Sequence, residues 1–181
     1  TLTVTAGTGT VDFTADIGTD GGAGGAELGG LSVTAGTINV DANVRSVGAT
    51  FTGSTAVNID TSAANVTVDG RTAEVVIAGQ TISVAGGATL TTSVTSANIV
   101  FSGDTADDTS DIDDAATAAQ VELSEAELRT VAAAVNEIVV GMDSTQSGTI
   151  TVDETAGLDG LATSLRLRGE LGPVVIAGPV D

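Results

Sequence analysis

The sequence lacks the residues on which most enzymes and nucleic-acid-binding proteins depend. Its 181 residues include no Lys, His, Cys, Trp or Tyr, and only three Phe and two Pro. The absence of His and Cys excludes cysteine nucleophiles, Ser-His triads and ordinary zinc sites. Acids outnumber bases by 24 to 5, which argues against DNA, RNA and anionic membranes as partners because those need basic patches. No apolar run approaches the roughly 18 residues of a membrane-spanning helix, so we expect no membrane span.

The residues that are abundant indicate a folded β protein. The chain has 24 glycines, and 41% of its residues are hydrophobic, which is enough aliphatic content to form a core and argues against disorder. From residue 1 to 103 apolar and polar residues alternate in short runs broken by Gly, Asn, Asp or Ser, the pattern of short strands in an all-β fold. The apolar members of these runs are Leu2/Val4, Val11/Phe13, Leu31/Val33, Ile38/Val40, Val57/Ile59, Val66/Val68, Ile82/Val84 and Ile99/Phe101.

Internal repeats favour a solenoid over a sandwich. Residues 2–8 (LTVTAGT) recur at 31–37 as LSVTAGT, and residues 75–79 (VVIAG) recur unchanged at 174–178. Hairpin turns of the Asn-Gly type are nearly absent, since Asp69-Gly70 is the one such pair that directly follows a predicted strand, so we expect parallel strands stacked coil upon coil. At roughly 20–30 residues per coil the chain makes about six to nine coils.

We predict that residues 1–181 form a single solenoid, which is interrupted by a glycine-rich loop and by an acidic segment followed by a helix. Residues 1–103 are predicted β-helix coils with a glycine-rich loop at 18–30, and residues 138–181 are predicted further coils. Between them we predict an acidic loop at 104–123 and a helix within 124–137.

The predicted helix, over about 125–137, has a clear beginning. Ser124 and Glu127 form a Ser-x-x-Glu capping box, and Leu123 before the cap can pack on Leu128 as a hydrophobic staple. One apolar stripe follows at helical spacing. Its members are Leu128, Val131, Val135 and Ile138.

Several of these motifs resemble a known group of proteins. The run ELSEAEL at 122–128, the strand IVVG at 138–141, and GTITV at 148–152 are similar to a recurring module of filamentous-haemagglutinin-like, β-strand-repeat bacterial exoproteins. Many of these are adhesins exported by two-partner or related secretion. The resemblance implies a right-handed parallel β-helix displayed outside the cell, with no catalytic residues.

One cluster of acids is a candidate calcium site, because Ca²⁺ takes six to eight oxygens from flexible loops. The alternative is a solvated loop whose charges protect a β-rich protein from aggregation. The spacing is not that of an EF-hand, and the glycine run at 21–26 has Ala26 where a Gly-Gly-x-Gly-x-Asp calcium repeat needs Asp. The candidate calcium ligands are Asp104, Asp107, Asp108, Asp111, Asp113 and Asp114.

Two other features have both a functional and a structural interpretation. Threonine pairs, as at Thr89/Thr91, can stack into hydroxyl rows that bind ice or carbohydrate, although high β-propensity on a wet face explains them better. Arg166 and Arg168 share one strand face and can hold a carboxylate-bearing partner, but we expect them to pair with Glu170 or with acids of preceding coils.

Three functions follow from these patterns. The first is a non-catalytic structural or adhesive segment of a secreted, repetitive bacterial surface protein that contacts carbohydrate or protein. The second is the protomer of a head-to-tail extracellular filament or surface layer, and the third is a β-helical polysaccharide lyase or hydrolase. Since neither end of the sequence resembles a cap, we expect both ends to meet further β-helical structure, from the same chain or another copy.

Overall fold

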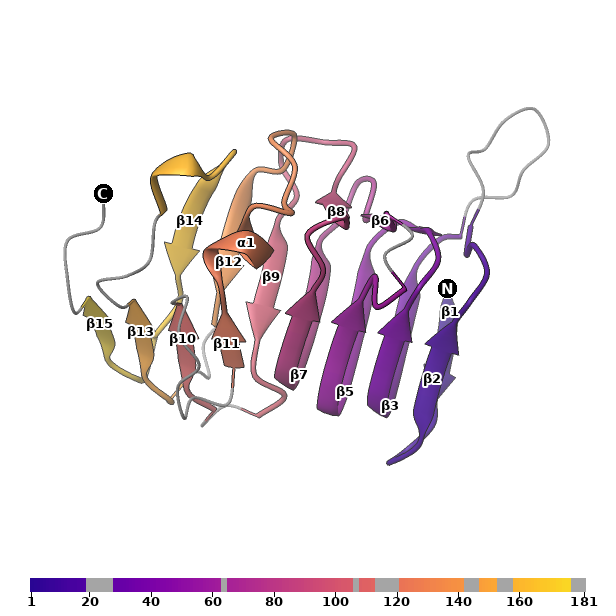
Figure 1. The fold of residues 1–181 in the computed structure, drawn as a ribbon, viewed down its shortest axis with the longest axis horizontal. Helices are drawn as coiled ribbons and strands as arrows, with labels where there is room; N and C mark the ends of the chain where they lie inside the picture. The colour runs from indigo at the N-terminus through magenta and orange to yellow at the C-terminus, as the bar shows by residue number, and fades with distance from the viewer. Residues whose placement is uncertain are drawn as a thin grey trace.

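The structure, a computed structural model, describes residues 1–18, 28–62, 65–105, 108–112, 121–141, 147–152 and 158–176. They form a parallel β-solenoid of about 6 turns, and Figure 1 shows the coils side by side along the long axis of the molecule. The predicted all-β solenoid is therefore confirmed. No helix among the described residues is long and apolar enough to cross a membrane.

The coils build three sheets. The largest contains strands in the order β1-β3-β5-β7-β9-β12-β14, with β2 also paired to β3. The second has the order β11-β10-β13-β15, and the third has β4-β6-β8. The strands of the first sheet are β1 (Leu2–Thr5), β2 (Thr10–Phe13), β3 (Leu31–Val40), β5 (Ala49–Ile59), β7 (Val75–Val84), β9 (Ile99–Ser102), β12 (Glu137–Val140) and β14 (Ser164–Leu167). The others are β10 (Ser110–Ile112), β11 (Val121–Leu123), β13 (Ile150–Val152), β15 (Val174–Ile176), β4 (Val44–Arg45), β6 (Thr67–Asp69) and β8 (Thr89–Thr91).

The strand pairings between described residues are parallel, and the sequence repeat sets one of them. Leu2 pairs with Leu31 and Val4 with Val33, so the first four residues of the two LxVTAGT copies are paired, and the register then shifts so that Thr37 pairs with Thr10. The Asp69-Gly70 pair makes no hairpin. It forms a corner, where Gly70 donates its N–H to the Thr91 carbonyl of the next coil.

The core consists of aliphatic columns that run from coil to coil. Alternate strand residues point inward, and each inward residue stacks on its partner in the next strand. One column contains Val33, Phe51, Ile77, Phe101 and Val140, none of them exposed. Burial of each such side chain contributes about 1.5–3 kcal/mol, so the columns stabilise the stacking of the coils.

The acidic segment differs from the prediction, because it supplies two strands. β10 and β11 lie within 104–123, where a loop was expected, and Ile112 and Leu123 are buried. A strand is compatible with this composition since its inward positions are filled by Ser110, Ile112, Val121 and Leu123. β11 lies between the second half of β7 and β10, although it follows β10 in the chain (Figure 1). This face of the solenoid therefore has one strand more than the face that ends in β14.

The predicted helix at 125–137 is too long. α1 spans Glu125–Leu128, and its capping box is present as predicted. After α1 the chain pairs with the edge of β8: Leu90 donates its N–H to the Thr130 carbonyl, and Ala132 donates to the Leu90 carbonyl. Strand pairing thus takes the place of the next helical turns, which β-branched Thr130 and Val131 favour only weakly. The four residues of the predicted apolar stripe are all buried, but mostly outside the helix.

Candidate functional site

The polar side chains on the flanks of the solenoid bond to neighbouring coils. On β2, β3 and β5 the Asn39 amide donates to Asp12 at 2.6 Å, and the Asn58 amide donates to Asn39 at 2.8 Å. These three residues are partners in the strand register. Outward polar side chains therefore form a row across these strands, and they join coils by hydrogen bonds worth about 0.5–1.5 kcal/mol each.

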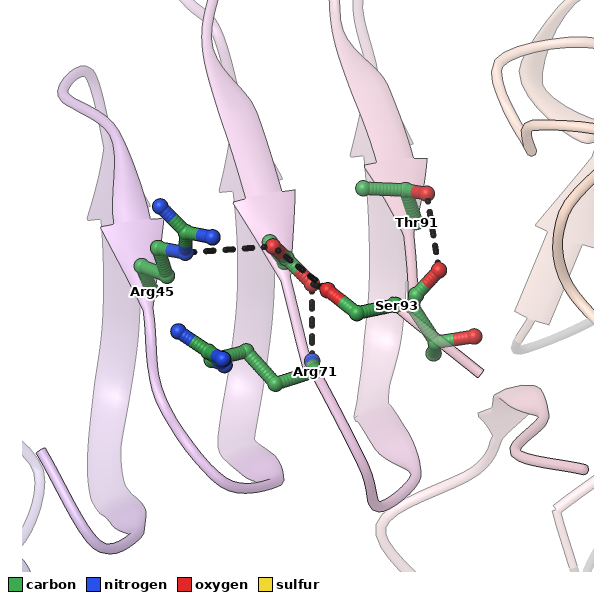
Figure 2. Close-up of polar contacts among 6 residues, drawn as sticks. Arg45, Arg71, Thr91 and Ser93 are labelled. Atoms are coloured by element: carbon green, nitrogen blue, oxygen red, sulfur yellow. Dashed lines mark hydrogen bonds and ion pairs between the residues drawn. The ribbon is translucent and has the colours of Figure 1, made fainter. Parts of the chain in front are cut away.

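The corner formed by β4, β6 and β8 is organised by Asp69, whose partners Arg45, Arg71 and Ser93 are labelled in Figure 2. Asp69 Oδ1 accepts the Arg71 backbone N–H at 2.7 Å, while Oδ2 accepts the Ser93 hydroxyl at 3.3 Å and lies 3.4 Å from Arg45 Nε. One carboxylate thus contacts the coil before it, its own turn and the coil after it. The arrangement is an inter-coil contact between an acid and a base.

A shallow groove of about 640 Å³ lies beside this corner. Gly18 lines this groove. Its φ is +76°, and a Cβ there would lie 2.0 Å from the Arg45 carbonyl oxygen, so only glycine fits. In the groove Asp16 accepts the Asn43 backbone N–H at 3.0 Å, and Asn43 accepts the Thr67 N–H at 2.9 Å. These side-chain oxygens accept hydrogen bonds from backbone N–H groups of the next coil, and so they hold neighbouring coils together.

Asp41 is a carboxylate whose hydrogen bonds lower its pKa. The Thr61 hydroxyl donates to both of its oxygens, at 2.6 and 2.8 Å, and the Ser62 N–H donates at 3.0 Å. The hydrogen bond from Thr61 is the main reason that the pKa of Asp41 lies below its usual value, and burial opposes the shift. Hydrogen bonds to the ionised form favour it. Asp41 therefore joins its coil to the next one as a carboxylate.

The structure describes only part of the candidate calcium site. Asp107, Asp113 and Asp114 lie outside the described residues, as does the side chain of Asp111, whose backbone is in β10. Asp108 is 1% exposed, and it accepts the Thr105 N–H and hydroxyl at 2.9 and 2.8 Å. Within the described ranges no three Asp or Glu side chains gather as metal ligands. Calcium binding through Asp104 and its neighbours stays a prediction.

The remaining sequence candidates have separate outcomes. The glycine run at 21–26 lies outside the described residues. Arg166 lies 3.6 Å from Glu137 of the preceding coil, so the expected pairing with a preceding acid is confirmed for this residue. Thr89 and Thr91 stack beside Thr67 and Asp69 on the third sheet, where they join the Asp69 corner.

The sequence analysis missed three polar contacts that connect elements far apart in the chain. Glu127 caps α1 and also accepts the N–H of Val84, at the end of β7, at 3.0 Å. Asn98 donates to Glu74 at 2.8 Å and accepts from Asn136 at 3.0 Å. Only the capping box gives a sequence signal, because the coil-to-coil partners depend on the register of distant strands.

Comparison with known proteins gives a uniform result. No protein-family model, no curated protein and no solved structure matches the chain, so its function has to be inferred from its own residues and their geometry.

Proposed function

We propose that the chain is a non-catalytic structural or adhesive segment of a secreted, repetitive protein of the bacterial cell surface. The observation that carries this proposal is the use of the flank side chains. Asp12, Asn39, Asn58 and Asp69 hydrogen-bond from coil to coil on the outside of an aliphatic core. A rod assembled in this way holds its shape without cofactor or disulfide, and it displays a long polar flank to partners.

Secretion and surface display rest on the resemblance of 122–128, 138–141 and 148–152 to β-strand-repeat exoproteins. The high negative charge supports the same assignment, because it keeps a β-rich protein soluble. Antibodies raised against the purified segment, applied to intact and to permeabilised cells, test whether the segment is displayed at the cell surface. We expect labelling of intact cells and its loss after external protease. Labelling confined to permeabilised cells would contradict the proposal.

A second candidate function is the protomer of an extracellular filament or surface layer. It is favoured by the exposed apolar side chains of the last coil, among them Leu171 and Ile176. The mass of the native polypeptide separates the two functions. A chain of thousands of residues indicates an exoprotein, and a species near 17.5 kDa indicates a protomer.

A polysaccharide lyase or hydrolase ranks last. Such sites use paired carboxylates or a basic residue in a cleft, and the chain has no Lys, His, Trp or Tyr to contribute. Assays on acidic and neutral polysaccharides, with and without Ca²⁺, test this ranking, and reproducible turnover would overturn it. Calorimetric titration tests calcium separately: absence of both heat and thermal shift at millimolar Ca²⁺ would remove Asp104–Asp114 as a site.

A further inference from the structure

The groove beside the corner of β4, β6 and β8 lies on the flank of the solenoid, between two rows of side chains. Val44 and Val68 are buried partners in this sheet, and because side chains alternate along a strand, the residues on either side of them point outward. The outward residues that line the groove come from three successive coils, Asp16, Asn43 and Thr67 in one row and Gly18, Arg45 and Asp69 in the other. Coils are about 4.8 Å apart, so the groove extends for about 10 Å along the solenoid. Its volume of about 640 Å³ is within the range of roughly 300–1,000 Å³ typical of small-molecule sites.

The side chains of the first row have atoms that the contacts between coils do not use. Asp16 accepts the Asn43 N–H through Oδ1, and Asn43 accepts the Thr67 N–H through its own Oδ1. Among the described residues, the second oxygen of Asp16, the amide nitrogen of Asn43 and the hydroxyl of Thr67 have no partner. Asp16 and Asn43 are exposed, and Thr67 is half-buried. The groove therefore offers an acceptor, a donor and a hydroxyl in three successive coils.

The charges in the groove restrict the class of ligand. Arg45, labelled in Figure 2, lies 3.4 Å from Asp69, so with Asp16 the described lining has two carboxylates and one guanidinium. An anion is repelled by this lining and by the chain's net charge of -19. Within the described ranges no three acids gather to hold a metal ion. Val44 is the one apolar residue of the described lining, so the groove lacks the apolar anchors that hold a protein partner.

We propose that this groove binds a neutral saccharide. A hydroxyl group both donates and accepts hydrogen bonds, so the hydroxyls of a sugar can donate to Asp16, accept from Asn43 and do either with Thr67. A linear oligosaccharide presents such hydroxyls unit after unit and can follow the three coils. Without charge, it meets no repulsion from the acidic chain. This inference deepens the proposed adhesive role and rests on it.

Two conservative variants and one matched control test the groove. Asp16→Asn keeps Oδ1 for the Asn43 N–H and replaces the second acceptor by a donor. Thr67→Val removes a hydroxyl that the coil contacts do not use and keeps a β-branched side chain. Thr89→Val makes the same change one coil further, at an exposed position that pairs with Thr67 and is not one of the residues lining the groove. Urea unfolding establishes that all three variants fold as the parent chain does.

Binding is measured in two steps with the purified chain. An array of neutral, uronic acid and sialylated oligosaccharides first gives the class of ligand, and calorimetry then measures the affinity for the strongest neutral ligand. We expect binding to neutral oligosaccharides, with an affinity that is the same at about 0.1 and 1 M salt because the ligand has no charge to screen. Asp16→Asn and Thr67→Val should each weaken it by about tenfold, and Thr89→Val by less than about twofold.

Several outcomes would overturn the inference. They are the absence of binding to every neutral oligosaccharide, a preference for acidic ones, and an affinity that Asp16→Asn and Thr67→Val leave unchanged. An equal loss in Thr67→Val and Thr89→Val would also contradict it, because a flat threonine surface would then be the ligand's contact. Surface labelling of cells is a separate result. Labelled intact cells without saccharide binding contradict the groove alone, and saccharide binding by a segment found only in permeabilised cells contradicts the proposed location alone.

Discussion

Residues 75–79 and 174–178 share the sequence VVIAG, and the three residues described in both copies lie in two different settings. In β7, Val75 and Ile77 have no exposed surface, while in β15 Val174 and Ile176 are 42% and 59% exposed. Both strands point these side chains inward, as their pairing with buried residues of β5 and β13 indicates. β7 has a strand on either side, β5 and β9, whereas β15 pairs with β13 alone among the described strands. Burial is therefore decided by the neighbouring coils and not by the pentapeptide.

The test with the largest expected effect on stability replaces an isoleucine by alanine at matched positions of the two strands. Ile77→Ala should lower the free energy of unfolding by about 2–5 kcal/mol, because it leaves a cavity in a packed column. Ile176→Ala should change it by less than about 0.5 kcal/mol, the usual range for a surface position. Urea unfolding of both variants measures the difference. Equal losses would mean that the last coil is covered in solution.

A second test addresses the hydrogen bond that Glu127 accepts from the Val84 N–H at the end of β7. Glu127→Ala removes the helix cap and the acceptor for the Val84 N–H, and it should cost about 1–2 kcal/mol. Glu127→Gln keeps an acceptor at this position and should lose less, since Gln also serves in capping boxes. Glu125→Ala removes the neighbouring i,i+4 contact with Arg129 and is the control. If Glu125→Ala lowers the free energy of unfolding in urea as much as Glu127→Ala does, the hydrogen bond between Glu127 and Val84 has no specific effect on stability.

A third test concerns the row of polar side chains beside β7. Asn98→Ala breaks the hydrogen bonds to Glu74 and Asn136, and should lower the free energy of unfolding by about 1 kcal/mol. Thr89→Ala, at an exposed position of β8, should leave it nearly unchanged. Thermal unfolding compares the two variants, and an Asn98→Ala protein as stable as the parent would show that the row does not join the coils.

The smallest effect is a dependence on pH. The pKa of Asp41 is lower in the folded state than in the unfolded chain, so its contribution is present above the unfolded pKa and disappears as pH falls through the folded pKa. Thr61→Val should raise the pKa of Asp41 toward its usual value, because the main donor is lost. An NMR titration of the Asp41 carboxyl follows the shift. The same titration curve in both proteins would exclude Thr61 as the cause.

The errors of the sequence analysis occur where pairing with a distant strand competes with a local pattern. Val131 and Val135 have helical spacing, yet Val131 pairs with Leu90 of β8. The edge of β8 offers backbone hydrogen bonds that no local window contains. Likewise, Asp density suggested a loop around Ser110, but alternate inward positions there are small or apolar and fit a strand.

The sequence by itself determined the alternating strands, the parallel stacking and the beginning of α1. Each of these follows from local periodicity, capping chemistry or repetition, as in the stacking of Leu2 on Leu31. Only the tertiary structure decided that β11 enters between β7 and β10, that Glu127 holds Val84, and that Val174 is exposed where Val75 is buried. The physical reason is that burial and hydrogen bonding between coils depend on which strands become neighbours, and identical residues acquire different neighbours at different places in the solenoid.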